Sequence, residues 1–180
     1  KRQVRQASSD IWNQALGQIA VKGNNEKEMV KFYSALYNAH FLPRTFSDVD
    51  GSYPRFDGDG QIMKMDHGTY YCDFSQWDTY RAVHPLFSIL TPSRNGDMAH
   101  SLVLKGQQGG WLPIFPSWNS YTAAMIGDHC IAMIGDAIVK DTPGFDYEEA
   151  YTLMRKNAFE ANPDSGSYRD GKGRRAMESY

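Results

Sequence analysis

The sequence predicts an all-α fold with a small β-hairpin excursion at about residues 44–76. Apolar residues recur every three to four positions on both sides of this excursion, which is the spacing of a buried helix face. The excursion contains three Asp-Gly pairs, starting at Asp50, Asp57 and Asp59, and the alternating run Gln61 to Met65, a pattern typical of a hairpin. About six helices are expected, joined by loops of alternating length and without an internal repeat.

Two helices are expected before the excursion. The cluster Ser8 to Asp10 suits an N-cap, and it is followed by an apolar face made of Ile11, Trp12, Ala15, Leu16 and Ile19. The run Gly23 to Asn25 ends this helix and caps the second, whose apolar face holds Met29, Phe32, Tyr33, Leu36 and Tyr37. The second helix is expected to end before Pro43, because a residue that precedes proline disfavours the helical conformation.

Four helices are expected after the excursion. The first covers about residues 80–90 and ends before Pro92, and Asp97 is expected to cap the second, which runs to Gly109. A Pro/Trp-rich loop precedes residues 122–139, which are expected to form the longest apolar helix. Asp146 and Glu149 form a capping box for the last helix, at residues 147–161, and a loop rich in Gly, Ser and charge follows at residues 163–175.

Composition is that of an ordinary globular protein. Of the 180 residues, 41% are apolar and 22% are charged, and 19 basic against 21 acidic residues leave a formal charge of −2. Because no long run of Lys and Arg and no transmembrane-length apolar stretch occurs, neither nucleic acid nor membrane insertion is expected, and the segment has no signal peptide. For Cys72 and Cys130, one disulfide and two buried thiols both remain open.

The most distinctive motif is the block from Phe74 to Arg81, which reads Phe-Ser-Gln-Trp-Asp-Thr-Tyr-Arg. Trp77 offers a flat apolar face for the C–H side of a pyranose, and the carboxylate of Asp78 can accept hydrogen bonds from two neighbouring sugar hydroxyls. Arg81 lies one helical turn beyond Asp78 and is expected to orient that carboxylate. The same residues also suit a structural role, with an N-cap aspartate, a buried Trp and an ion pair.

Two further constellations carry candidate residues. In the loop that ends at Thr122, two glycines and two prolines are expected to display Trp111, Trp118 and Tyr121 as a sugar platform, although the loop also suits a packed plug for the helix bundle. Asp128 and His129 are adjacent on the expected long helix, so only one of them can readily face a given pocket. A lone histidine is equally at home as a structural hydrogen-bonding group.

One apparent metal motif is discounted. Residues 57–60, Asp-Gly-Asp-Gly, carry the alternating oxygen ligands of a calcium loop, but Gln61 replaces the next ligand and no glutamate closes the loop. The segment is therefore interpreted as a hairpin turn. The sequence also lacks a nucleophile elbow, a P-loop and a dinucleotide fingerprint.

Taken in order, these blocks resemble glycoside hydrolase family 92, the calcium-dependent exo-acting α-mannosidases. The run Trp77 to Arg81 carries the most specific part of the resemblance. The matching blocks are residues 32–40, 43–44, 46–53, 74–86, 110–113, 125–129, 136–137 and 145–151.

The resemblance implies that residues 1–180 are part of an (α/α)6 barrel, with about half of its helices, and that the rest of the barrel and an N-terminal β-sandwich domain lie outside this sequence. It implies an inverting mechanism with a glutamate acid, an aspartate base and a bound calcium, acting on mannose-containing glycans such as N-glycans in the periplasm or outside the cell. By analogy, Trp77 and Asp78 bind the terminal mannose. The other substrate-binding candidates are Arg81, Trp118, Thr122, Asp128 and His129.

The sequence departs from the family at the catalytic blocks. The family's acid lies in a Glu-Gly-Asn block, its calcium site includes a Gly-Asn-Glu-Pro block and its base lies in an Asn-Asp-Asp run, and none of these occurs here. The acid, the base and the calcium ligands are therefore expected in the remaining portion of the catalytic domain, and the isolated chain is expected to be inactive. The alternatives are a non-catalytic carbohydrate-binding or scaffold fragment and an unrelated (α/α)6 enzyme acting on glucosides or uronides, against which the Trp-Asp-Thr-Tyr-Arg run argues.

Overall fold

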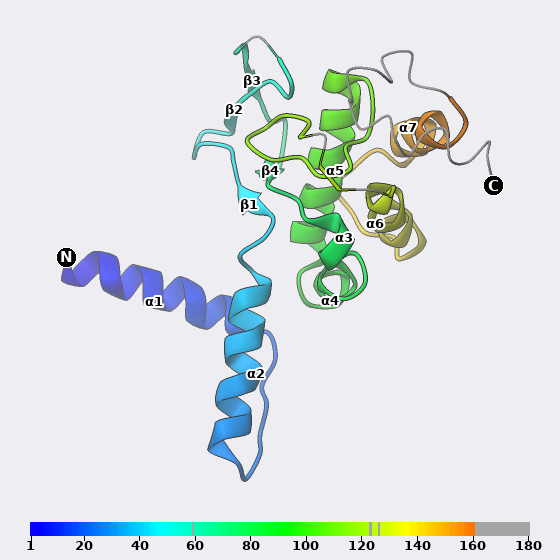
Figure 1. Ribbon diagram of the computed structural model, residues 1–180. Coiled ribbons are helices and arrows are strands. Elements are labelled where there is room, and N and C mark those ends of the chain that lie inside the picture. Colours follow the sequence, from blue (N-terminus) through cyan, green and yellow to red (C-terminus); the bar gives the residue numbers. More distant parts are fainter. Residues whose placement is uncertain (59, 123, 126, 161–180) are drawn as a thin grey trace. The chain divides into compact units, whose positions relative to one another are not determined.

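The computed structural model describes residues 1–58, 60–122, 124–125 and 127–160. The chain divides into two compact units, residues 1–41 (unit 1) and residues 42–180 (unit 2). Across the described residues the secondary structure consists of seven helices and four short strands (Figure 1), which confirms the expected mainly helical fold with a small β excursion. None of the described helices combines the length and the apolar character needed to cross a bilayer.

Unit 1 is a pair of helices, α1 (Arg2–Leu16) and α2 (Glu26–Ala39). The Trp12 and Tyr37 rings pack with their centroids 4.4 Å apart, and the Tyr33 hydroxyl donates to the Ile19 carbonyl at 3.0 Å. The expected start of the first helix near residue 10 is wrong. The helix already begins at Arg2, and Asp10 accepts a hydrogen bond from the Gln6 side chain one turn earlier instead of capping.

The β excursion of unit 2 forms two antiparallel pairs. Strand β2 (Ser52–Pro54) pairs with β3 (Ile62–Lys64), as expected for a hairpin around the Asp57 turn, and β1 (Arg44–Thr45) pairs with β4 (Tyr71–Cys72). The Tyr53 and Tyr70 rings stack with centroids 3.9 Å apart, and Met65 completes a small buried cluster with them. This cluster gives the hairpin an apolar face, without which so short a strand pair is not stable.

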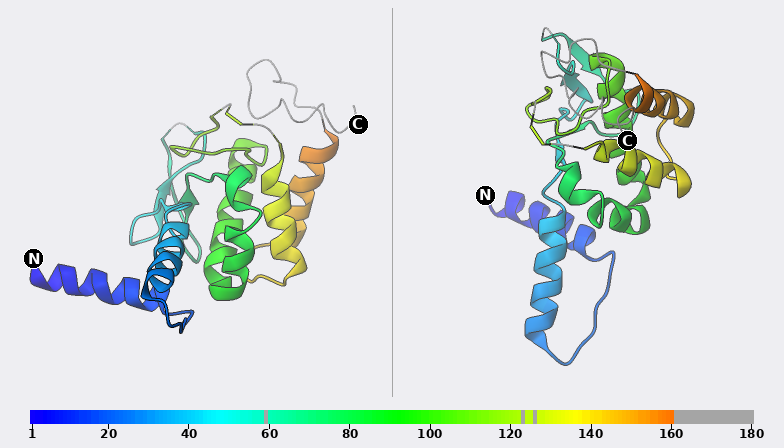
Figure 2. Two further views of the ribbon diagram at one scale, coloured as in Figure 1. Left: turned by 60° about the horizontal axis from the view of Figure 1, so that its bottom comes forward. Right: turned by 45° about the vertical axis from the view of Figure 1, so that its right-hand side comes forward.

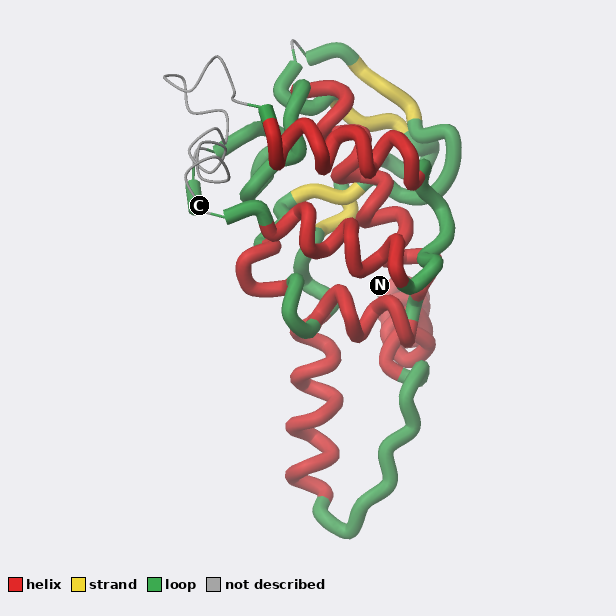
Figure 3. The backbone as a smooth tube through the Cα atoms, turned by 90° about the vertical axis from the view of Figure 1, so that its right-hand side faces the viewer, coloured by secondary structure: helices red, strands yellow, loops and turns green. Residues whose placement is uncertain are grey.

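The helices of unit 2 pack around one central helix, and three of them lie side by side (Figure 2). The central helix is α5, which contacts α4, α6 and α7 and the strand β4. The tube view (Figure 3) shows the same arrangement from another side. The five helices are α3 (Gln76–Thr79), α4 (Val83–Leu90), α5 (Pro92–Gly109), α6 (His129–Val139) and α7 (Tyr147–Phe159).

Two helix starts in unit 2 differ from expectation. Helix α5 begins at Pro92, because a proline at the first position of a helix loses no hydrogen bond, so Asp97 lies inside the helix rather than at its cap. Helix α6 begins at His129 rather than at residue 122, because Met125 and Gly127 adopt left-handed backbone conformations with φ of 65° and 89°. The longest described helix is therefore α5.

The remaining expectations for the helices hold in part. The helix expected at about residues 80–90 is α4, which begins at Val83, and the short helix α3 before it was not expected. Helix α7 begins as predicted, since the Asp146 carboxylate accepts a hydrogen bond from the Glu149 amide at 3.0 Å. The loop expected at residues 163–175 lies outside the described residues.

The core of unit 2 lies between α5 and the elements around it. Phe74, Phe87 and Leu102 are fully buried there, and each such side chain contributes about 1.5–3 kcal/mol by leaving water. Cys72 and Cys130 are both buried and no disulfide joins them, which decides the alternative that the sequence left open.

Candidate functional site

The block from Phe74 to Arg81 is buried at its start and exposed at Trp77 and Asp78. Phe74 is fully buried, and its amide donates to the Pro116 carbonyl at 3.1 Å, which ties the block to the loop before α6. Trp77 and Asp78 lie in the short helix α3 with exposed side chains. Because the Ser75 hydroxyl donates to the Asp78 carboxylate, the orientation of that carboxylate is fixed from within the block.

A stack of planar groups connects α3 to the start of α6, and we call its members Trp77, Arg81, Tyr80 and His129 the aromatic stack. The Arg81 guanidinium lies 5.2 Å from the Trp77 ring centroid and 5.1 Å from the Tyr80 ring centroid. The Arg81 Nε donates to the Tyr80 hydroxyl at 2.9 Å, and the Tyr80 and His129 rings stack at 4.7 Å. The structure thus brings three predicted site residues together: Trp77, Arg81 and His129.

The predicted ion pair between Arg81 and Asp78 is wrong. Arg81 contacts the rings of Trp77 and Tyr80, and the Asp78 carboxylate accepts its hydrogen bond from Ser75. A guanidinium that lies over two aromatic faces gains cation–π attraction on both, which outweighs an exposed ion pair of little net value.

Asp128 and His129 stand at the start of α6 instead of inside a long helix. Asp128 precedes the helix, and His129 is its first residue. Burial lowers the pKa of His129, the nearby positive charge of Arg81 lowers it further, and Asp128 opposes both. His129 is therefore a neutral imidazole at pH 7, able to donate from one ring nitrogen and accept at the other.

The loop before α6 displays one tryptophan, not two as expected. Trp111 is buried, with its amide donating to the Tyr121 hydroxyl at 3.1 Å, and the Tyr121 hydroxyl donates to the Trp111 carbonyl at 2.5 Å. Trp118 is 84% exposed. Within this loop Trp111 is therefore packed, as expected for a plug, whereas Trp118 presents an exposed ring.

A cavity of about 220 Å³ lies beside Trp118. Asp73 fixes its shape, because its carboxylate accepts from the Trp118 amide at 3.1 Å and pairs with Arg44 at 3.3 Å. The cavity lining consists of Leu42, Arg44, Asp73, Ser75, Phe115, Ser117 and Trp118. Trp77 and Asp78 are not in that lining as far as the structure describes it, and Ser75 is the residue that links the cavity to Asp78.

Thr122 has a local role in the loop. Its hydroxyl donates to the Phe115 carbonyl at 2.6 Å and accepts from the Ala124 amide at 3.3 Å. It therefore holds the cavity wall at Phe115 in place.

Two polar residues of this region were not expected from the sequence. Asp73 has a positive φ of 58° and orients Trp118, but nothing in the sequence marks it apart from other acidic residues of the excursion. Gln76 is fully buried, and neither polar atom of its amide has a hydrogen-bond partner within the described part of the chain. Its position inside the Phe74 to Arg81 block was the available signal.

The described residues do not fit the calcium that the family resemblance implies. Ca²⁺ takes about six to eight oxygen ligands. Among the described residues, the only group of at least three His, Cys, Asp or Glu side chains that converges well enough for a metal is Asp66, His67 and His100, which offers two nitrogens. Asp57, at the discounted calcium-like turn, accepts from the Ser120 hydroxyl at 2.9 Å. No chemistry of this chain is therefore derived through calcium.

Comparison with known proteins identifies relatives among solved structures. The chain matches BT3965, a family GH92 alpha-mannosidase from Bacteroides thetaiotaomicron, in complex with mannoimidazole at 35% identity and a TM-score of 0.81, over 88% of this chain and 21% of that one. It matches another structure of BT3965 at 34% identity and a TM-score of 0.82, over 90% of this chain and 22% of that one. The family GH92 inverting mannosidase BT2199 from the same organism matches at 26% identity and a TM-score of 0.85, over 99% of this chain and 24% of that one.

The chain therefore spans less than a quarter of the length of each of these structures. Among curated protein sequences, none matches it significantly. The arrangement of its helices fits part of an (α/α) barrel, as in these relatives. The sequence profile described as the glycosyl hydrolase family 92 catalytic domain matches residues 1–180, and the chain accordingly belongs to this family.

Proposed function

We propose that this chain is part of the catalytic domain of an exo-acting, inverting α-mannosidase and that it shapes the subsite for the terminal mannose. The observation that carries the proposal is its similarity, over 88% of its length, to an α-mannosidase solved with mannoimidazole. The substrate is a mannose-containing glycan such as an N-glycan. The family resemblance supports a periplasmic or secreted location.

The site chemistry supports sugar binding at two exposed faces. Trp77 and Trp118 are 40% and 84% exposed, so each presents an aromatic face on which the C–H side of a pyranose can stack. Asp78 is exposed beside Trp77, and its second oxygen can accept sugar hydroxyls while Ser75 holds the first. The neutral His129 adds a donor and an acceptor at the other end of the aromatic stack.

The acid, the base and the calcium ligands are proposed to lie in the remaining portion of the catalytic domain, with which this segment associates. The five described glutamates support this, because all of them lie in or directly beside α2 and α7 and none belongs to the loops that form the site: Glu26, Glu28, Glu148, Glu149 and Glu160. The same observation favours a second function for these 180 residues taken alone, namely carbohydrate binding without hydrolysis.

Replacing Asp78 by Ala in the complete protein tests the subsite. We expect kcat/KM for an aryl α-mannoside to fall by roughly 100-fold, or about 3 kcal/mol, because a sugar-hydroxyl acceptor is lost where the ring must distort. The free energy of unfolding should change little, since Asp78 is exposed.

The matched control is Asp10→Ala, which removes an exposed carboxylate from α1 that accepts a hydrogen bond from Gln6. It should keep wild-type kinetics. If Asp78→Ala also keeps wild-type kcat/KM, the assignment of Asp78 to the mannose subsite is wrong.

A further inference from the structure

Three segments of unit 2 meet away from the aromatic stack and the Trp118 cavity. His67 follows β3, His100 lies in α5, and Gly144 lies between α6 and α7. The His67 and His100 rings stack with centroids 4.7 Å apart. His67 Nδ1 lies 2.9 Å from the Asp66 carboxylate, and His67 Nε2 lies 3.0 Å from the Gly144 carbonyl oxygen.

These contacts decide which ring nitrogen of His67 must carry a proton. A carbonyl oxygen only accepts, so Nε2 carries a proton and donates it to Gly144. In the neutral ring, Nδ1 then presents a lone pair to the Asp66 carboxylate, which is also an acceptor. Two acceptors 2.9 Å apart require a positive species between them, either a proton on Nδ1 or a metal ion.

His100 adds a third side chain to this cluster. It retains only 9% exposure, and its Nδ1 has no hydrogen-bond partner within the described residues. One ligand atom from each of Asp66, His67 and His100 lies within 4.8 Å of the other two. A buried ring nitrogen without a partner is costly, and a bound ion removes that cost.

We propose that Asp66, His67 and His100 form a binding site for a divalent transition-metal ion of the zinc type. Two imidazoles and one carboxylate are ligands that Zn²⁺ prefers, with bonds of about 2.0–2.2 Å, and water can take the fourth position. The donation from His67 to the Gly144 carbonyl is the outer contact that orients a metal-bound histidine. The Asp66 and His67 side chains are exposed, so they can turn to close on the ion, with the His67 ring leaving its stack on His100.

The backbone around the site is already held in place. The Asp97 carboxylate accepts from the Thr69 amide at 3.0 Å, and it approaches so closely that a Cβ on Gly68 would lie 2.2 Å from it. A Cβ on Gly96 would lie 1.8 Å from the Pro143 carbonyl oxygen. Glycine at these two positions therefore allows the hairpin excursion, α5 and the segment before α7 to come together, and the ion would cross-link the first two.

Zinc titration of the complete, tag-free protein tests the site. After chelator treatment and return of excess Ca²⁺, we expect calorimetry to show one Zn²⁺ bound per chain, and Co²⁺ to give the visible absorption of a four-coordinate nitrogen–oxygen site. Asp66→Asn and His67→Gln should each weaken Zn²⁺ binding by at least about tenfold, since each removes a ligand or its charge. Both side chains are exposed, so the fold should survive.

The control Asp10→Asn should bind Zn²⁺ as the wild type does, since Asp10 is not one of the three proposed ligands. Absence of Zn²⁺ binding by the wild-type protein would overturn the proposal. So would equal binding by Asp66→Asn and His67→Gln, or displacement of the ion by millimolar Ca²⁺, which would indicate an oxygen site elsewhere.

Discussion

At the residue scale, two tryptophans of one loop have opposite roles. Trp111 is buried, with the Lys156 ammonium 4.7 Å from its ring centroid, whereas Trp118 is 84% exposed beside the cavity. The sequence shows both as similar aromatic residues near proline. Burial decides which one supports the fold and which one is available to a ligand.

Alanine substitutions of these two residues should separate stability from binding. Trp111→Ala should lower the free energy of unfolding by about 3–5 kcal/mol, because it leaves a cavity in the packed loop. Trp118→Ala should change that free energy by no more than about 0.5 kcal/mol but raise KM for an aryl α-mannoside, because only an exposed stacking face is lost. Urea unfolding and steady-state kinetics of the complete protein check both. Comparable destabilisation by the two variants would contradict the assignment.

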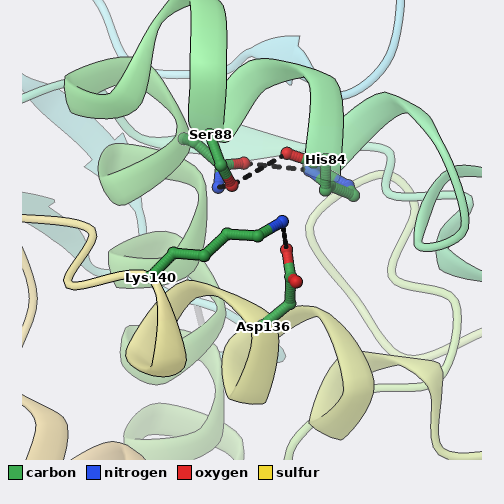
Figure 4. Close-up of polar contacts among 5 residues, drawn as sticks. His84, Ser88, Asp136 and Lys140 are labelled. Atoms are coloured by element: carbon green, nitrogen blue, oxygen red, sulfur yellow. Dashed lines mark hydrogen bonds and ion pairs between the residues drawn. The ribbon is translucent and has the colours of Figure 1, made fainter.

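At the element scale, a buried polar network joins α4 to α5 (Figure 4). His84 Nδ1 lies 3.3 Å from Asn95 Oδ1, and the Asn95 amide donates to the Ser88 hydroxyl at 3.0 Å. Burial lowers the pKa of His84 to about 4, although Asn95 and the carboxylate of Asp136 on α6 oppose this. Asp136 itself pairs with Lys140 at 2.7 Å in the same view.

The lowered pKa of His84 makes stability depend on pH in a defined direction. Below pH 6.5 the unfolded chain takes up a proton at His84, but the native state does so only near pH 4, so the unfolding free energy falls as pH drops through this window. The full effect is roughly 3 kcal/mol, since a tenfold change in proton affinity is worth about 1.4 kcal/mol.

Urea unfolding of the wild type and of His84→Gln at several pH values between 7 and 4 measures this effect. The glutamine amide can still donate to Asn95 but does not titrate, so the variant should lose less stability than the wild type on acidification. His67 and His100 remain in both proteins, which removes their contribution from the comparison. Parallel pH profiles for the two proteins would show that His84 is not the titrating group.

Element types were easier to predict than element boundaries. The second and last helices and the hairpin followed from local signals: apolar spacing, an Asp N-cap and Asp-Gly turns. The starts of α5 and α6 did not, because Pro92 can end one helix or begin the next, and nothing in the local sequence predicts a left-handed backbone at Met125. The residue pattern also did not predict that Lys105 is buried.

Lys105 shows why the interior was harder to predict than the surface. It is fully buried in α5, with its ammonium 3.6 Å from the Tyr70 ring centroid and donating to the Tyr71 carbonyl at 2.7 Å, and burial lowers its pKa to about 7. A lysine in a helix is normally exposed. The contact of Lys105 with the Tyr71 carbonyl therefore follows only from the packing of β4 on α5. At the candidate site, the sequence likewise identified Trp77, Trp118 and His129 but not the Tyr80 ring that connects two of them.

At the scale of the whole molecule, we propose that the work of the enzyme is divided between parts of the catalytic domain. This chain supplies the aromatic stack, the exposed Trp118 and the carboxylate of Asp78. Inverting hydrolysis also requires an acid and a base about 6.5–9.5 Å apart. Two carboxylates of this chain outside the candidate site are already engaged: Asp50 accepts from the Ser52 amide, and Asp136 pairs with Lys140.

The central claim is that these 180 residues bind the sugar but do not carry the catalytic pair. Turnover of an aryl α-mannoside with calcium supplied, measured in parallel for the complete protein and for the 180-residue chain whose helical content has been verified by circular dichroism, tests it most directly. The account predicts hydrolysis by the complete protein and none above the matched blank by the isolated chain. Turnover by the isolated chain, or none by the complete protein, would contradict it.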